Sequence, residues 1–227
     1  MKDIEYFKLA HKLNEDNKTI LLKEKVHFIA SLKSISLISI SNEKPELGIK
    51  CNANKYQVTE NSFDILSKDI SKLKIKSAPK RPTPEKELQS WIINYALNNN
   101  KSLPFDNDIK FITSELAILN QKGKKIITDI LGYSESLKKL YVIELKSERL
   151  RKRLIEQVNN FENVIIENPD FFSQLLSIYG YKSSKDVSIK INKAVVWPYK
   201  KKSPDKVLLD LNIIEFTYQT GFSFLKL

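Results

Sequence analysis

Two apolar segments of the chain read Ile126-Ile127-Thr128-Asp129-Ile130-Leu131 and Leu140-Tyr141-Val142-Ile143-Glu144-Leu145-Lys146, and a polar segment at 132–139 separates them. Apolar, β-branched runs on either side of a short polar turn are typical of a β-hairpin. If the hairpin is symmetric about Ser136 and Leu137, Asp129 lies opposite Glu144, and directly opposed residues share one face of the sheet. Lys146 follows Glu144 by two positions, so it is expected on that face too.

The three charged residues of this hairpin are costly to bury together. Two ionised carboxylates repel each other, so one of them tends to keep a proton. A divalent cation would remove the conflict, and oxygen ligands suit Mg²⁺. The alternative is a solvated hairpin in which Glu144 and Lys146 pair, since Glu-x-Lys is a common tripeptide. Val142, Ile143 and Leu145 weigh against it, because they indicate a strand that is buried on both faces.

The motif formed by Asp129, the turn and Glu144-Leu145-Lys146 resembles that of the PD-(D/E)xK nucleases, the restriction-endonuclease-like superfamily. Thr128 stands where the family's name-giving proline would be, and that proline is often absent in the family. The resemblance covers residues 84–218 and no part of 1–78. It implies an α/β fold with a restriction-endonuclease-like core: a helix, a three-stranded antiparallel meander, a second helix and a further strand.

The chain divides into two predicted domains. Residues 1–78 are expected to form a small β-rich N-terminal domain, with helices at 3–15 and 61–73 and strands at 19–23, 26–32, 35–40, 46–51 and 56–59. Residues 77–84 contain three prolines, which interrupt helices and strands, and so mark the boundary. Residues 83–227 would then form the nuclease-like domain.

Three further residues are candidates for the site. The resemblance implies an acidic residue on the helix predicted from Pro84, for which Glu87 is the candidate and Glu85 the reserve; the alternative is that both serve the helix terminus. Glu115 would face Asp129 if the turn between them is symmetric about Lys122; alternatively, it is a cross-strand partner for a lysine. Gln157 matches a glutamine that orders the site in the NucS-like branch of the family; alternatively, it is a partly exposed helix residue.

Basic residues crowd the chain after the motif. The formal net charge of +11 favours a polyanionic partner, with nucleic acid ahead of a membrane surface, although a general lysine bias would also produce it. We expect the phosphate contacts to come from the start of the following helix, at Arg149, Arg151, Lys152 and Arg153.

The cysteine and histidine content and the lengths of the apolar runs limit which cellular location and which metal sites are expected. Cys51 is the only cysteine, so no intrachain disulfide can form, and a reducing, cytoplasmic location is expected. One cysteine and two histidines argue against a zinc site. The charged N-terminus does not resemble a signal peptide, and no apolar run is long enough to predict a membrane span.

The resemblance and the residues together predict a DNA endonuclease that depends on Mg²⁺ or Mn²⁺. Asp129 and Glu144 would hold the metal with the carbonyl of Leu145, while Lys146 would orient the attacking water; Glu87 and Gln157 would complete the site. The N-terminal domain would select the substrate or form a homodimer. Two alternatives stay open: a nucleic-acid-binding or structural module of the same fold without cleavage, and cleavage of RNA.

Overall fold

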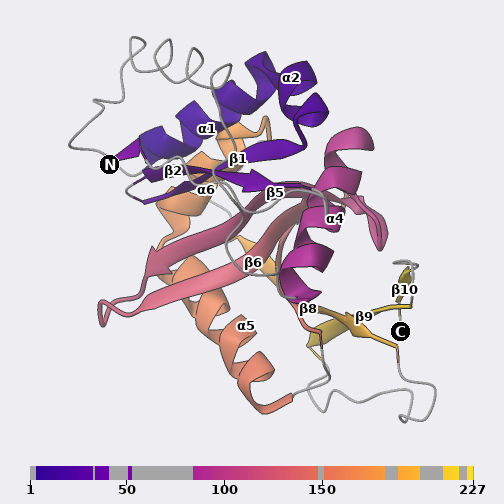
Figure 1. Ribbon diagram of the computed structural model, residues 1–227. Helices are drawn as coiled ribbons and strands as arrows, with labels where there is room; N and C mark the ends of the chain where they lie inside the picture. Colours follow the sequence, from indigo (N-terminus) through magenta and orange to yellow (C-terminus); the bar gives the residue numbers. More distant parts are fainter. Residues whose placement is uncertain are drawn as a thin grey trace.

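A seven-stranded mixed sheet occupies the centre of the computed structural model, which describes residues 4–32, 34–40, 51–52, 84–147, 151–181, 189–199, 212–219 and 224–226 (Figure 1). The strand order is β10-β9-β8-β7-β6-β5-β4. The strands are β4 (Ser102–Leu103), β5 (Asp106–Leu119), β6 (Lys125–Ser134), β7 (Lys139–Leu145), β8 (Lys190–Pro198), β9 (Ile213–Tyr218) and β10 (Phe224–Lys226). The α/β class predicted from the sequence is confirmed.

The direction of the strands changes in the middle of the sheet. β5, β6 and β7 form an antiparallel meander, whereas β8 runs parallel to β7 and β9 parallel to β8. A parallel pair needs a crossover connection. Helices α5 (Arg151–Glu167) and α6 (Pro169–Ile178) lie in the crossover between β7 and β8.

The hairpin of β6 and β7 has the register expected from its sequence. Ile130 pairs with Ile143, and Ser134 with Lys139, as the symmetry about Ser136 and Leu137 requires. The preceding turn is also centred as predicted: Leu116 pairs with Thr128, which is symmetric about Lys122. Gly123 in this turn has φ +72°, a left-handed conformation that glycine adopts without steric cost.

The two faces of β7 are buried by different helices. Leu140 and Val142 belong to an apolar cluster with Phe161 and Val164 of α5. Tyr141, Ile143 and Leu145 point to the other face, into a cluster with Leu88 and Ile92 of α4 (Pro84–Asn98). Burial on both faces explains why this strand is almost continuously apolar, and it makes any charged residue in it conspicuous.

The described part of the N-terminal segment packs against the large sheet. It contains α1 (Ile4–Asp16), α2 (Lys18–Lys23) and a three-stranded sheet of β1 (Val26–Ser31), β2 (Ser34–Ser39) and β3 (Cys51–Asn52). Phe7 and Leu13 of α1 share one apolar cluster with Ile112 of β5 and Phe172 of α6. Figure 1 shows α1 and α2 above β1 and β2, and β1 lies against β5 of the large sheet. A separate N-terminal domain stays a prediction, because residues 53–83 lie outside the described ranges.

One predicted strand is a helix. The run at 19–23 was expected to be extended, but Lys18–Lys23 forms α2. Leu21 is buried while its neighbour Ile20 is half exposed, so the helix buries one side of an apolar run that local pattern alone cannot assign. The predicted helix at 61–73 lies outside the described residues. None of the helices described is long and apolar enough to cross a membrane.

Candidate active site

Asp129 and Glu144 lie near each other where β6 and β7 meet. The register that pairs Ile130 with Ile143 places these two residues opposite each other one step further along. The backbone N–H of Leu145 donates a hydrogen bond to Asp129 Oδ2 at 2.8 Å. Glu144 is 3% exposed, and Asp129 is partly exposed. The hairpin therefore brings two carboxyl groups to one place at the edge of the core.

Lys146 completes this cluster. Its Nζ donates to Glu144 Oε1 at 3.1 Å, and the lysine side chain is only 16% exposed. The backbone on both sides of this side chain is held: Lys146 N–H donates to the carbonyl of Val196 at 2.9 Å, and the Tyr218 hydroxyl donates to the Lys146 carbonyl at 3.3 Å. β8 and β9 thus fix the position of a residue just beyond β7.

The electrostatics of the pair follow from its burial. Desolvation, and then the proximity of Asp129, raises the pKa of Glu144 to about 8. Desolvation also raises the pKa of Asp129, although the hydrogen bond from Leu145 and the charge of Lys146 act in the opposite direction. At neutral pH the pair therefore tends to retain a proton, as expected for two buried carboxyl groups near a single ammonium.

Helix α4 contacts this part of all three meander strands. Gln89 Nε2 donates to the carbonyl of Asp129 at 2.8 Å, and Lys86 forms an ion pair with Glu115 of β5. Glu85 Oε1 accepts a hydrogen bond from the N–H of Ser147, just after β7, at 3.2 Å. Position 89 follows positions 85 and 86 by four and three residues, so the Gln89 side chain shares a side of the helix with both.

The reserve candidate on α4, rather than the first choice, reaches the site. Glu85 contacts Ser147, whereas Glu87 is partly buried and has no hydrogen bond or ion pair to another described residue. Glu85 and Glu87 are two residues apart, about half a helical turn, so their side chains point in nearly opposite directions. The sequence motif did not indicate which of the two faces the site. Glu115 is near enough to raise the pKa of Asp129, but its carboxylate is paired with Lys86. The alternative expected from the sequence was a cross-strand lysine, whereas this lysine lies on α4.

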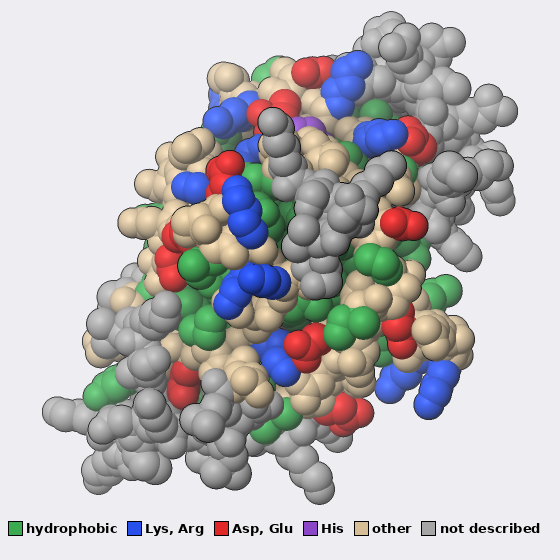
Figure 2. Space-filling view, turned by 180° about the vertical axis from the view of Figure 1, so that it is seen from behind, with side chains coloured by type: hydrophobic (Ala, Val, Ile, Leu, Met, Phe, Trp, Pro, Cys, Tyr) green, Lys and Arg blue, Asp and Glu red, His purple; other side chains and the backbone are tan. Residues whose placement is uncertain are grey.

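The remaining predicted residues are placed less completely. Gln157 is partly buried on α5, with no hydrogen bond to the site within the described part of the chain. Arg151, Lys152 and Arg153 form the first turn of α5, but their side chains and Arg149 lie outside the described residues. On the face shown in Figure 2, the described basic and acidic side chains are interspersed. A phosphate-binding surface therefore stays a prediction.

Sequence reasoning did not single out Gln89, although the sequence carried a signal for it. Ile92, Ile93 and Ala96 follow at three, four and seven positions, and all are buried. A glutamine that shares their helix face must be buried and needs a hydrogen-bond partner. In the structure Gln89 is 5% exposed, and the Asp129 carbonyl is that partner.

The donor set suits a hard divalent cation held with water. Within the ranges that the structure describes, no group of three or more His, Cys, Asp and Glu gathers as a protein-only metal cage would require. Mg²⁺, however, is usually bound through one or two carboxylates and keeps several waters. Asp129 and Glu144 supply two such groups, and a cation would relieve the repulsion that now favours a shared proton.

Comparison with known proteins found no relative of this chain. No protein-family model matches the chain, and no similar protein was found among the curated proteins or the solved structures. The function must therefore be argued from the site.

Proposed function

We propose that the protein is a metal-dependent endonuclease that hydrolyses phosphodiester bonds in DNA, on a core of the restriction-endonuclease-like type. The observation that carries the proposal is the convergence of Asp129, Glu144 and Lys146 at one end of the β6–β7 hairpin. Supporting it is the order of elements around that hairpin. A helix, an antiparallel meander, a helical crossover and a parallel strand follow one another in α4, β5–β7, α5 and β8, as the resemblance in the sequence implies.

Each residue of the cluster has a distinct role in the proposed reaction. Asp129 and Glu144 would hold Mg²⁺ or Mn²⁺, with the Leu145 carbonyl as a further ligand. The bound metal would supply polarisation of a phosphoryl oxygen and a water of lowered pKa. Lys146, held by Glu144 and by its own backbone contacts, would orient the attacking water and offset the negative charge that develops on the phosphate.

The residues of α4 would position the backbone of the site. Gln89 fixes the backbone of Asp129, and Glu85 fixes the chain after Lys146 through Ser147. Both contacts limit the movement of one strand end relative to the other, which matters because catalysis depends on groups held in a productive geometry. Gln157 would support the site from α5, which packs on the other face of the sheet from α4.

The test is cleavage by the purified protein. Supercoiled plasmid and labelled single-stranded, branched and RNA substrates are incubated with Mg²⁺, with Mn²⁺ or with EDTA. We expect metal-dependent cleavage of DNA that Asp129→Asn and Glu144→Gln both abolish. Glu167→Gln, a change of an exposed carboxylate at the end of α5, is the matched control and should cleave normally. Full activity of both site variants would refute the site. Tight DNA binding without cleavage in any metal would favour the non-cleaving alternative.

A further inference from the structure

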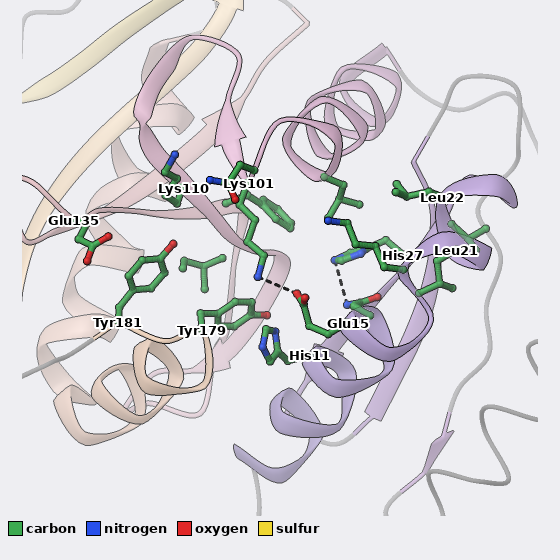
Figure 3. A pocket seen from close by; sticks show the side chains of 17 residues that line it. His11, Glu15, Leu21, Leu22, His27, Lys101, Lys110, Glu135, Tyr179 and Tyr181 are labelled. Carbon is green, nitrogen blue, oxygen red and sulfur yellow. Dashed lines mark hydrogen bonds and ion pairs between the residues drawn. The ribbon is translucent and has the colours of Figure 1, made fainter.

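A cavity of about 380 Å³ lies between the N-terminal segment and the large sheet, and its lining comes from distant parts of the chain (Figure 3). α1 contributes His11 and Glu15, β1 contributes His27, and the turn after α4 contributes Lys101. Tyr179, just after α6, closes another side. The volume falls within the range of roughly 300–1,000 Å³ that small-molecule sites occupy.

The polar groups of the cavity are held in place by their neighbours. Lys101 Nζ forms an ion pair with Glu15 Oε1 at 2.9 Å and lies 5.6 Å from the centre of the Tyr179 ring. The His11 ring lies 4.7 Å from that same ring. Figure 3 shows the Lys101 side chain extending across the cavity toward Glu15. This ion pair joins α1 to the turn between α4 and β4.

The backbone that carries Lys101 turns sharply after α4. Asn100 and Lys101 are consecutive non-glycine residues with φ values of 50° and 62°. The N–H of Lys101 donates to the carbonyl of Ala96 at 2.8 Å, so this conformation closes the C-terminus of α4. The same turn places the ammonium group of Lys101 in the cavity.

His27 presents a hydrogen-bond donor that its neighbours leave unused. Asn14 Oδ1 accepts from Phe28 N–H at 2.9 Å, so its Nδ2 group donates, to the Phe28 carbonyl at 2.8 Å and to His27 Nε2 at 3.3 Å. Nε2 of the neutral imidazole is therefore the acceptor, and Nδ1 carries the proton. Among the described residues Nδ1 has no hydrogen-bond partner, although His27 is 7% exposed.

The chemistry of the lining selects one class of ligand. Leu21, Leu22 and Val26 give an apolar wall, which a bare anion would leave uncovered. A purely apolar ligand would instead leave the His27 donor unsatisfied, which is unfavourable in a buried site. Beyond the Lys101–Glu15 ion pair, two lysines against one glutamate in the lining leave one positive charge, which also favours an anionic ligand.

We propose that this cavity binds a single nucleotide, with the base against the apolar wall, His27 Nδ1–H donating to it, and the phosphate near Lys101. The nucleotide could reach the cavity free in solution or as one extruded from DNA, and both sources present the same chemistry. Only the second source rests on the proposed nuclease function. Extrusion of a base costs its stacking energy, which a fitted pocket can offset.

The test measures binding in EDTA, so that cleavage plays no part. Calorimetry with each of the four deoxynucleoside monophosphates probes the free source, with inorganic phosphate as the comparison ligand. Duplex DNA that carries a fluorescent purine analogue, whose emission rises when it leaves the stack, probes the extruded source. We expect saturable binding in at least one arm, and inorganic phosphate should bind at least tenfold more weakly, since it cannot use the apolar wall.

Two variants and a matched control assign the binding to this cavity. Lys101→Asn removes the ammonium but tolerates positive φ, and His11→Ala removes the ring beside Tyr179. Lys138→Asn changes an exposed lysine with φ 53° that does not line the cavity. Lys101→Asn should weaken binding by roughly 10- to 100-fold, the range for a lost hydrogen bond to a charged group, while Lys138→Asn should not.

Three outcomes would overturn the inference: no binding in either arm, equal binding of inorganic phosphate, or binding that both cavity variants leave unchanged. None of these depends on whether Asp129 and Glu144 are catalytic. Conversely, if the protein binds a nucleotide but cleaves no substrate, the result would support nucleotide binding in this cavity and refute the proposed function.

Discussion

Lys146 is the residue whose replacement best separates an enzyme from a binding module. If it only balances the charge of Glu144, a metal ion can replace it, and cleavage should persist without it. If it orients the attacking water, its loss removes an interaction made chiefly in the transition state. We expect Lys146→Ala and Lys146→Arg to fold and bind DNA but to cleave more slowly by about 10²-fold or more at saturating Mg²⁺.

Single-turnover cleavage is the measurement for these Lys146 variants, because it isolates the chemical step from product release. Arginine should not rescue the lysine, since a guanidinium is bulkier and keeps its proton at working pH. A wild-type rate in either variant would remove Lys146 from the proposed mechanism.

Gln89 provides a second prediction at this scale, as a positioning residue that acts through Asp129. Gln89→Leu puts an apolar side chain of similar size in the core but leaves the Asp129 carbonyl without its donor. We expect the free energy of unfolding to fall by about 1–3 kcal/mol. We also expect a lower kcat and a higher Mg²⁺ requirement, with DNA affinity unchanged.

Denaturant unfolding and metal titration of cleavage measure these two effects of Gln89→Leu. Gln174→Leu changes an exposed glutamine on α6 and should alter neither quantity. If Gln89→Leu loses stability but keeps the Mg²⁺ dependence of the native protein, the residue serves the fold alone.

At the scale of elements, the contact between α1 and β1 predicts a dependence of stability on pH. Burial lowers the pKa of His27 from 6.5 to about 3, and the charge of Lys101 acts in the same direction. Between those pH values the unfolded chain binds a proton that the folded protein does not. The free energy of unfolding therefore rises with pH across this window, by at most about 1.4 kcal/mol per pH unit from this group.

The test compares chemical unfolding of the native protein and of His27→Gln from pH 4 to pH 7. The variant cannot titrate at this position, so its stability should fall less steeply as the pH is lowered. Other groups that titrate in the same range, such as Glu15 and His11, contribute equally to both proteins and cancel in the difference. Identical slopes would mean that His27 is protonated in the folded protein as readily as in the unfolded chain.

At the scale of the whole molecule, the net charge of +11 predicts DNA binding that weakens steeply with salt. Each phosphate contact contributes a slope of about −0.9 in log K against log salt for duplex DNA. Replacement of Arg151, Lys152 and Arg153 by glutamine should flatten that slope. Replacement of Lys122 and Lys124, in the turn between β5 and β6, should change it less.

Fluorescence anisotropy at several KCl concentrations, with the Glu144→Gln variant in EDTA, measures the slope under conditions where we expect no cleavage. An affinity that does not depend on salt would point to a protein partner in place of nucleic acid.

The sequence by itself determined the hairpin and the meeting of Asp129, Glu144 and Lys146. The reason is local: side chains alternate with a period of two along a strand, and a short turn fixes the register. Thus Ile130 and Ile143 pair where the symmetry of the turn requires. Other local patterns, the helical spacing of apolar residues and the alternation of period two, predicted α1, α4 and the strands of the meander.

Only the tertiary structure decided the contacts between distant segments. The choice of Glu85 over Glu87, the bond from Gln89 to a carbonyl 40 positions away, and the helical state of Lys18–Lys23 all depend on which surface packs against which. The nucleotide-sized cavity has the same origin, because α1, β1, the turn after α4 and the end of α6 each supply part of its wall. Such contacts leave no periodic pattern in the sequence, since their partners are fixed by the packing of the core and not by the spacing of residues.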